Sequence, residues 1–187
     1  MHMALTVKRW TLAELHRLPD DGNKYELVRG ELFVTPPPSP DHETIASLLT
    51  RLLDPYVREH RLGLIYHPRA VVRVKRSEVE PDLSVRRQAP AATSWAAAPL
   101  PLLIVEILSP STWRRDQVQK RQLYMGAGIA EYWLVDEEDR TFRIARPDHE
   151  DIIVKTRFVW RPAGVKRGFT IDVRGLFREA LGIVSDR

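Results

Sequence analysis

The chain has 187 residues, of which 43% are hydrophobic and 29% are charged, a composition that suits one folded domain and excludes an intrinsically disordered protein. Its net charge of +4 is compatible with a nucleic-acid partner and equally with no anionic partner. The chain contains no cysteine, which excludes disulfide bonds and thiolate metal sites.

Residues 1–10 lack the apolar stretch of a signal peptide. No apolar run approaches the roughly 20 residues that a membrane-spanning helix needs. We therefore expect a cytoplasmic protein that does not enter a membrane and that folds as a single domain over residues 1–187.

The N-terminal third predicts a helix, a hairpin and a second helix. Residues 11–19 favour a short helix, with Thr11 as its N-cap and Glu14 as the capping-box acid. Residues 25–35 favour two strands around a turn at Arg29 and Gly30. After the proline-rich segment 36–41, an amphipathic helix is indicated by Ile45, Leu48, Leu49, Leu52, Leu53 and Val57.

The rest of the chain predicts mainly strands. They are expected in residues 62–76, 82–87, 102–108 and 131–146, and in two short runs before a helix at 176–181. Residues 113–127 favour a helix, whereas residues 89–101 favour no particular element. Helices alternate with groups of strands, which predicts an α/β (α+β) fold with a central mixed β-sheet flanked by helices.

Glu106 lies within the most hydrophobic predicted strand, residues 102–108. A buried carboxylate without a partner costs several kcal/mol, so Glu106 needs a metal, a lysine or an arginine. Asp82 follows Pro81 at the start of another strand and could converge with Glu106 at neighbouring strand positions. Two such carboxylates are typical ligands of a hard divalent cation such as Mg²⁺. A buried ion pair that only stabilises the fold is the alternative.

Lys120 is a cation that could meet Glu106. At about 100° per residue along the helix, Lys120 falls in the middle of one arc and Asp116 at its edge. The apolar members of this arc are Trp113, Leu123, Tyr124 and Ala127, whereas Arg114, Arg115 and Arg121 are predicted to point elsewhere. A lysine on a core-facing arc requires an anion, and Glu106, at the end of the preceding strand, is the nearest candidate.

These segments together resemble the PD-(D/E)XK nuclease superfamily, and more closely its Uma-two family of restriction-endonuclease-like proteins. The resemblance covers about residues 25–135. It is carried by YELVRGEL, PSPDH, EPDLSV, VEILSPST, Asp116 with Lys120, and YMGAGIAEYWLVD. It implies a restriction endonuclease-like core, here with extra N-terminal and C-terminal strands, and hydrolysis of DNA phosphodiester bonds with Mg²⁺ or Mn²⁺.

The resemblance also implies roles for individual residues. Asp82, Glu106 and the carbonyl of Ile107 would bind the metal. The superfamily has a lysine two residues after the glutamate, where this chain has Leu108. In the Uma-two pattern, a lysine on the following helix takes that place, and here it is Lys120, which would be catalytic.

Two further positions follow from the same resemblance. The family has a glutamate in the stretch that corresponds to YELVRGEL, and Glu26 and Glu31 both fit it. His42 matches the family's histidine after the proline-rich loop, although a histidine at the start of a helix can also simply pack on the surface.

The expected partner is nucleic acid, specifically DNA, with basic contacts from Arg73, Lys75, Arg86, Arg87, Arg114 and Arg115. A homodimer is expected because cutting both strands needs two active sites. One alternative is a nuclease-fold module that binds nucleic acid or oligomerises with little or no cleavage. Another is a structural oligomer in which Glu106 and Lys120 form only a buried pair.

Overall fold

A six-stranded mixed sheet forms the centre of the computed structural model, which describes residues 8–109 and 115–182. Its strand order is β10-β9-β8-β7-β6-β3. The strands are β3 (Leu64–Tyr66), β6 (Leu83–Arg86), β7 (Leu103–Leu108), β8 (Glu131–Asp136), β9 (Thr141–Ala145) and β10 (Ile152–Val154). Only the β7–β8 pair is parallel within this sheet, as expected where a helix connects two neighbouring strands.

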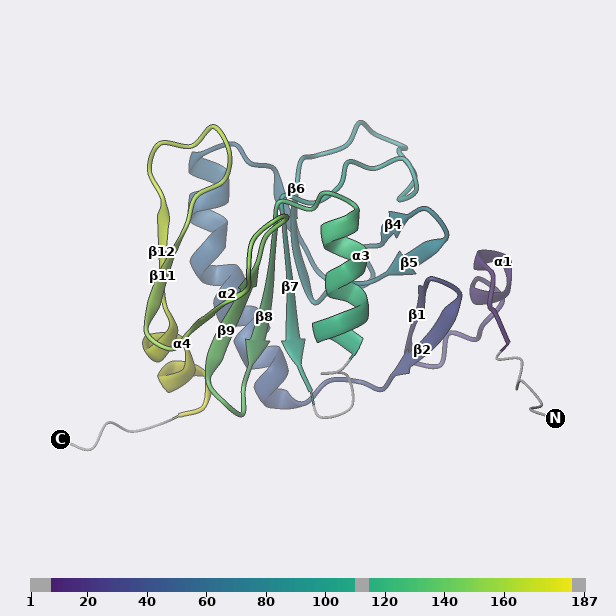
Figure 1. Cartoon of the computed structure of the whole chain (residues 1–187), viewed down its shortest axis with the longest axis horizontal. Helices are drawn as coiled ribbons and strands as arrows, with labels where there is room; N and C mark the ends of the chain where they lie inside the picture. Colours follow the sequence, from purple (N-terminus) through teal and green to yellow (C-terminus); the bar gives the residue numbers. More distant parts are fainter. Residues whose placement is uncertain (1–7, 110–114, 183–187) are drawn as a thin grey trace.

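One face of the sheet packs against two helices and a hairpin. They are α2 (Pro40–Glu59), α4 (Val173–Ala180), β11 (Arg157–Trp160) and β12 (Phe169–Asp172). In Figure 1, α2 runs behind the sheet, and the β11–β12 hairpin lies at the left. Alternate residues of β7, namely Leu103, Val105 and Ile107, enter the core on this face together with Leu49 and Trp133, which is the period-two pattern of a strand.

The opposite face carries the elements that build the candidate site. Helix α3 (Arg121–Gly126) follows a π-helical turn at Arg115–Lys120, and in Figure 1 α3 stands to the right of β7, nearly parallel to the strands. Beside it lies an antiparallel sheet of order β2-β1-β5-β4. Its strands are β1 (Lys24–Val28), β2 (Glu31–Thr35), β4 (Val72–Val74) and β5 (Ser77–Val79). Ile104 and Leu108 enter a second core here, with Leu123, Tyr124 and Tyr132.

The α/β class with a central mixed sheet flanked by helices is confirmed, as are the additional N-terminal and C-terminal strands. The capping box of Thr11 and Glu14 is present at α1 (Leu12–Leu15). Leu52 is 37% exposed, so its assignment to the buried face of α2 was wrong.

Two groups of strands differ from expectation. Strand β5 was not predicted, and three short strands rather than two precede α4. Within the described ranges, no helix is long and apolar enough to cross a membrane.

Candidate active site

Asp82 and Glu106 meet where β6 begins and β7 ends. The antiparallel register pairs Leu83 with Val105, so one further step places Asp82 opposite Glu106. The backbone N–H of Ile107 donates to Asp82 Oδ2 at 2.8 Å, which fixes the carboxylate against the end of β7. The sheet geometry therefore brings together the two carboxylates that the sequence proposed as a pair.

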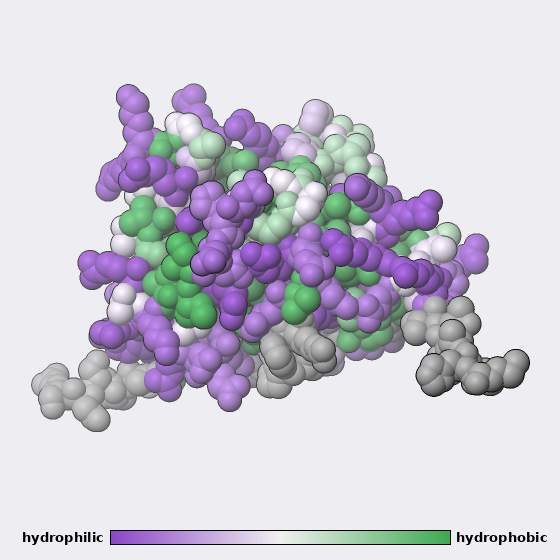
Figure 2. All heavy atoms as spheres, viewed as in Figure 1, coloured by the Kyte–Doolittle hydropathy of each residue, from purple (hydrophilic) through white to green (hydrophobic). Residues whose placement is uncertain are grey.

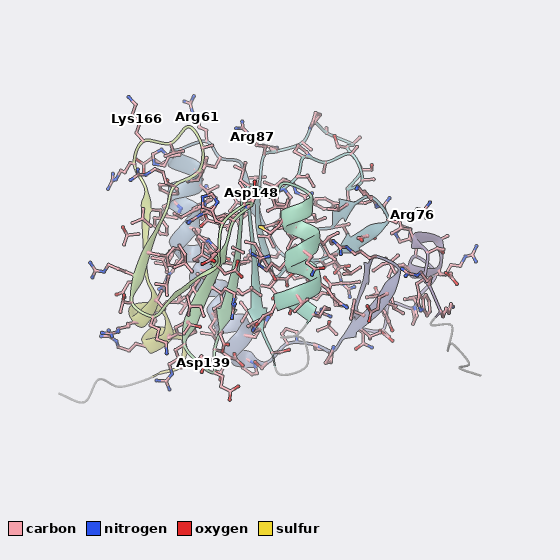
Figure 3. All side chains as sticks on the ribbon, in the orientation of Figure 1. Arg61, Arg76, Arg87, Asp139, Asp148 and Lys166 are labelled. Carbon is pink, nitrogen blue, oxygen red and sulfur yellow. The ribbon has the colours of Figure 1, made fainter. Side chains whose placement is uncertain are left out.

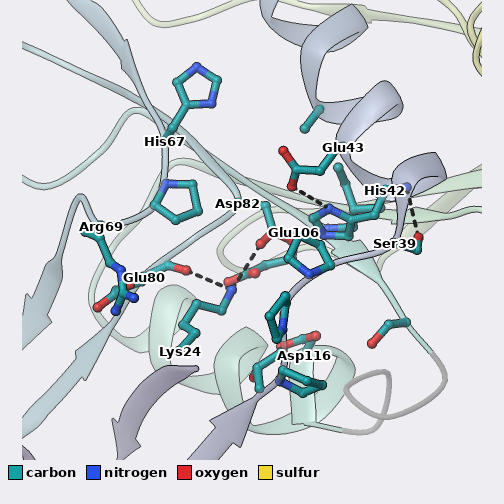
Figure 4. A pocket seen from close by; sticks show the side chains of 18 of the residues that line it. Lys24, Ser39, His42, Glu43, His67, Arg69, Glu80, Asp82, Glu106 and Asp116 are labelled. Carbon is teal, nitrogen blue, oxygen red and sulfur yellow. Dashed lines mark hydrogen bonds and ion pairs between the residues drawn. The ribbon is translucent and has the colours of Figure 1, made fainter. Parts of the chain in front are cut away.

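Both carboxylates line a cavity of about 500 Å³, together with Lys24, His42 and Asp116. The proline loop, the start of α2 and residues 67–69 also contribute to its wall, and Figure 4 shows this arrangement around Asp82. Asp82 and Glu106 are only 6% and 1% exposed. A ligand can therefore reach them only through the cavity.

The surroundings of Glu106 disfavour its ionised form. Lys120 Nζ lies 2.7 Å from its Oε1, to which the Tyr124 hydroxyl also donates at 3.0 Å. Burial raises the pKa of Glu106 to about 7 although Lys120 opposes the shift, and the charges of Asp82 and Asp116 add to it. An additional cation near Asp82 and Glu106 would stabilise the ionised form of Glu106.

Lys120 is completely buried and lies behind Glu106. Besides its contact with Glu106, its Nζ lies 2.8 Å from Glu26 Oε1 and 3.4 Å from Asp116 Oδ1. Lys120 therefore meets anionic partners in the interior of the protein, as the sequence predicted for Glu106. Lys120 is not among the described residues that line the cavity. Its positive charge therefore influences the cavity electrostatically, from behind Glu106.

The structure separates the two alternative glutamates. Glu26 in β1 is fully buried, and its Oε1 accepts the backbone N–H of Glu80 at 2.8 Å as well as meeting Lys120. Burial alone would raise its pKa, but attraction from Lys120, Lys24 and Arg115 outweighs burial and lowers the pKa to about 2. Glu31 at the start of β2 is exposed and accepts a hydrogen bond from Gln119 Nε2. Glu26 therefore belongs to the cluster, and Glu31 lies outside it.

His42 contacts Asp82 from the first turn of α2. Its Nε2 lies 3.1 Å from Asp82 Oδ2, and the Ser39 side chain caps the helix by accepting the His42 backbone N–H. Burial lowers the pKa of His42, but the hydrogen bond and the charge of Asp82 outweigh it, so the net shift is upward. The contact with Asp82 places His42 in the site rather than on the open surface.

Two basic residues of the site were missed from the sequence. Lys24 Nζ donates to Asp82 Oδ1 at 3.0 Å, and Arg115 Nε donates to Asp116 Oδ1 at 3.2 Å. A signal for Lys24 existed, because residues two apart on a strand share a face and Glu26 lies two residues later. The expectation that Arg115 points elsewhere was wrong. The helix begins with a π-helical turn, and its wider winding turns residues away from the 100° pattern.

Among the described residues, the basic side chains proposed to bind DNA are not all exposed. Arg86 is buried and donates to the Val71 carbonyl, Arg115 belongs to the site, and Arg73 pairs with Glu78. Lys75 and Arg87 remain exposed, and Arg114 lies outside the described residues. Figure 3 shows Arg87 projecting from the upper edge of the molecule, and Figure 2 shows hydrophilic side chains over most of the viewed face.

The donor atoms at the cavity can be compared with the needs of a divalent cation. Asp82 and Glu106 supply carboxylate oxygens. In extended backbone the N–H and C=O of one residue point to the same side, so the Ile107 carbonyl faces the Asp82 side of β7. This set fits Mg²⁺, which keeps several waters and needs few protein ligands. No cluster of three or more histidine or acidic side chains in the described ranges is arranged to enclose a metal.

The family comparison matches residues 12–174 to the Uma2 model, described as "Putative restriction endonuclease". The chain belongs to the Uma2 family. The matched range contains all the site residues discussed above, so this Uma2 chain carries them within the region that defines the family. None of the curated proteins matches the chain.

A solved structure shares the fold of this Uma2 chain. It is from Anabaena variabilis ATCC 29413 and is described as "a putative nuclease belonging to DUF820". The two chains are 20% identical and superpose with a TM-score of 0.76, over 91% of this chain and 99% of the other. At this identity the likeness establishes the fold alone.

Proposed function

We propose that this Uma2 protein is an endonuclease that hydrolyses DNA phosphodiester bonds with Mg²⁺ or Mn²⁺. The observation that carries the proposal is the meeting of Asp82 and Glu106 at one cavity. Among the described residues, the cluster contains four carboxylates and three permanent cations: Glu26, Asp82, Glu106 and Asp116 with Lys24, Arg115 and Lys120. When His42 is neutral, these side chains carry one more negative than positive charge, which an additional cation would offset.

Asp82, Glu106 and the Ile107 carbonyl would hold the divalent cation. When bound, such an ion supplies an acidified water and a Lewis acid for a phosphate oxygen. The protein's contribution is to fix its own ligands, since metal-binding carboxylates are oriented by the groups around them. His42 and the Ile107 N–H orient Asp82.

Lys120 and Tyr124 orient Glu106 in the same way, and the contact of Lys120 with Glu26 ties both acids to the helix. We propose that Lys120 also serves the reaction. Its buried positive charge would stabilise the negative charge that develops on the phosphate in the transition state. Glu26 then acts as the anchor that keeps Lys120 in place.

A second candidate function is a nuclease-fold module that binds nucleic acid or oligomerises without cleavage. It is favoured by the contacts of Asp82, whose two oxygens already accept bonds from Lys24, His42 and the Ile107 N–H. In that case the cluster would be a set of buried ion pairs that stabilises the fold. Such a module would not need a metal.

The test is incubation of supercoiled plasmid and branched DNA with MgCl₂ or MnCl₂, comparing the wild-type protein with Asp82→Ala. Nicking or cutting that requires the metal and disappears in the variant supports the endonuclease. DNA that stays intact with both metals, although it binds the protein, supports the non-cleaving module. Light scattering after size-exclusion chromatography measures whether the protein is the homodimer that double-strand cleavage would use.

A further inference from the structure

Lys24 is the first residue of β1 and lines the cavity with Asp82 and Glu80. Its Nζ donates to Asp82 Oδ1 at 3.0 Å and to the Glu80 carbonyl at 3.1 Å, as the dashed lines in Figure 4 show. Its side chain is 16% exposed. The ammonium group therefore sits directly on one of the two carboxylates proposed to bind metal.

The two lysines of the site differ in their surroundings. Lys120 is enclosed by Glu26, Glu106 and Asp116 and has no exposed surface. Lys24 borders the cavity, and its four-carbon stem carries a compact ammonium group with rotatable bonds. Of these two lysines, Lys24 is therefore the one that can change partners without opening the core.

The two oxygens of Asp82 also differ. Oδ2 is held by His42 Nε2 and by the Ile107 N–H, whereas Oδ1 accepts only from Lys24 among the contacts between described residues. Oδ1 is therefore the oxygen that a divalent cation would use. A metal ion and an ammonium group repel each other strongly at such separations, so binding of the ion to this oxygen favours departure of the Lys24 ammonium.

We propose that Lys24 is a built-in competitor for the divalent cation. In the resting site its ammonium neutralises Asp82, and it gives up Oδ1 when a divalent cation binds. Lys24 thus sets the metal affinity of the site and keeps the paired carboxylates neutralised in the absence of metal. This inference rests on the proposed function, since it assumes that Asp82 binds the metal.

The experiment is calorimetric titration of MnCl₂ into the wild-type protein, Lys24→Met and Lys24→Arg, with Lys166→Met as control. Lys166 is an exposed lysine that projects from the upper left edge of the molecule in Figure 3. Lys24→Met should bind Mn²⁺ about tenfold more tightly or better, because a competing charge is gone. Lys24→Arg keeps the charge and should show no gain, and Lys166→Met should match the wild-type protein.

An affinity of Lys24→Met equal to or below that of the wild-type protein overturns the inference. Thermal melting establishes that each variant is folded. If Lys24→Met is not folded, Lys24→Gln replaces it, because the amide can still donate to the Glu80 carbonyl but carries no charge. Tighter Mn²⁺ binding by Lys24→Met in a protein that cuts no DNA would reject the cleavage activity but keep the metal site at Asp82 and this inference. Metal-dependent DNA cleavage by the wild-type protein, together with an unchanged Mn²⁺ affinity of Lys24→Met, would support the proposed function and overturn this inference.

Discussion

Replacing Lys120 with methionine should lower the free energy of unfolding by about 3–5 kcal/mol, the cost of removing one partner from a buried ion pair. The Lys120 ammonium lies 2.7 Å from Glu106 Oε1, 2.8 Å from Glu26 Oε1 and 3.4 Å from Asp116 Oδ1, and it is fully buried. Methionine fills a similar volume but leaves these carboxylates without their shared cation. Glu106 then keeps the Tyr124 hydroxyl as its donor.

In a domain of this size, 1 kcal/mol corresponds to about 2–4 °C in melting temperature, so Lys120→Met should melt about 10 °C lower than the wild-type protein. The double variant Lys120→Met, Glu106→Gln should recover part of this loss, because Glu106 no longer carries an unpaired charge. Calorimetric melting of both variants, beside the exposed control Lys166→Met, measures the effect. A Lys120→Met protein that melts within about 2 °C of the wild-type protein would refute the role of Lys120 as the shared cation.

Three further outcomes are expected. The pKa of Glu26 is lowered from 4.5 to about 2, so its ionisation stabilises the protein above pH 4.5, and this contribution is lost as the pH falls towards 2. The melting temperature of Glu26→Gln should therefore decline less steeply over this pH range than that of the wild-type protein. Equal slopes for the two proteins would contradict the lowered pKa of Glu26. Gly63 has φ +123°, and an added Cβ would lie 2.0 Å from the Arg86 carbonyl oxygen. Gly63→Ala should therefore lower the free energy of unfolding, measured in urea, by about 3 kcal/mol or more. The control Gly126→Ala, whose added Cβ would meet nothing within 4 Å, should not lower it. DNA binding should weaken as the salt concentration rises. In the double variant Lys75→Ala, Arg87→Ala, the slope of log affinity against log salt concentration should fall by about 1 for each phosphate that the variant no longer binds. An unchanged slope would exclude both residues from the interface.

The central sheet could be predicted because its strands carry strong local signals. Residues 103–108 are a continuous apolar run around one carboxylate, and residues 131–145 form two strands around an acidic turn. Strand β5 carries no such signal. It consists of Ser77, Glu78 and Val79, and it is buried because it pairs with β1 and β4. Its existence depends on tertiary contacts that a local pattern does not contain.

The site was predictable to the extent that it depends on strand register and helical spacing. Asp82, Glu106 and Lys120 lie in segments with clear periodicity, and the structure brings them together. Arg115 was assigned to the wrong side because the pattern assumes α-helical winding, whereas the turn Arg115–Lys120 is π-helical. Lys120, the last residue of that turn, directly precedes α3 and so keeps its spacing to Leu123 and Tyr124. The spacing of Lys24 from Glu26 was a usable signal, but the contact of Lys24 with Asp82, 58 residues away, leaves no trace in the local pattern. Only the packing of the small sheet against the large one makes that contact.

The proposed function requires Asp82 and Glu106 to act together as one divalent-cation site. Calorimetric titration of MnCl₂ into the wild-type protein and into the Asp82→Ala, Glu106→Ala double variant tests this claim. The wild-type protein should bind the ion, and the double variant, once melting has shown that it is folded, should not. Equal binding by the two proteins would show that Asp82 and Glu106 do not form the metal site and would place any such site elsewhere in the chain.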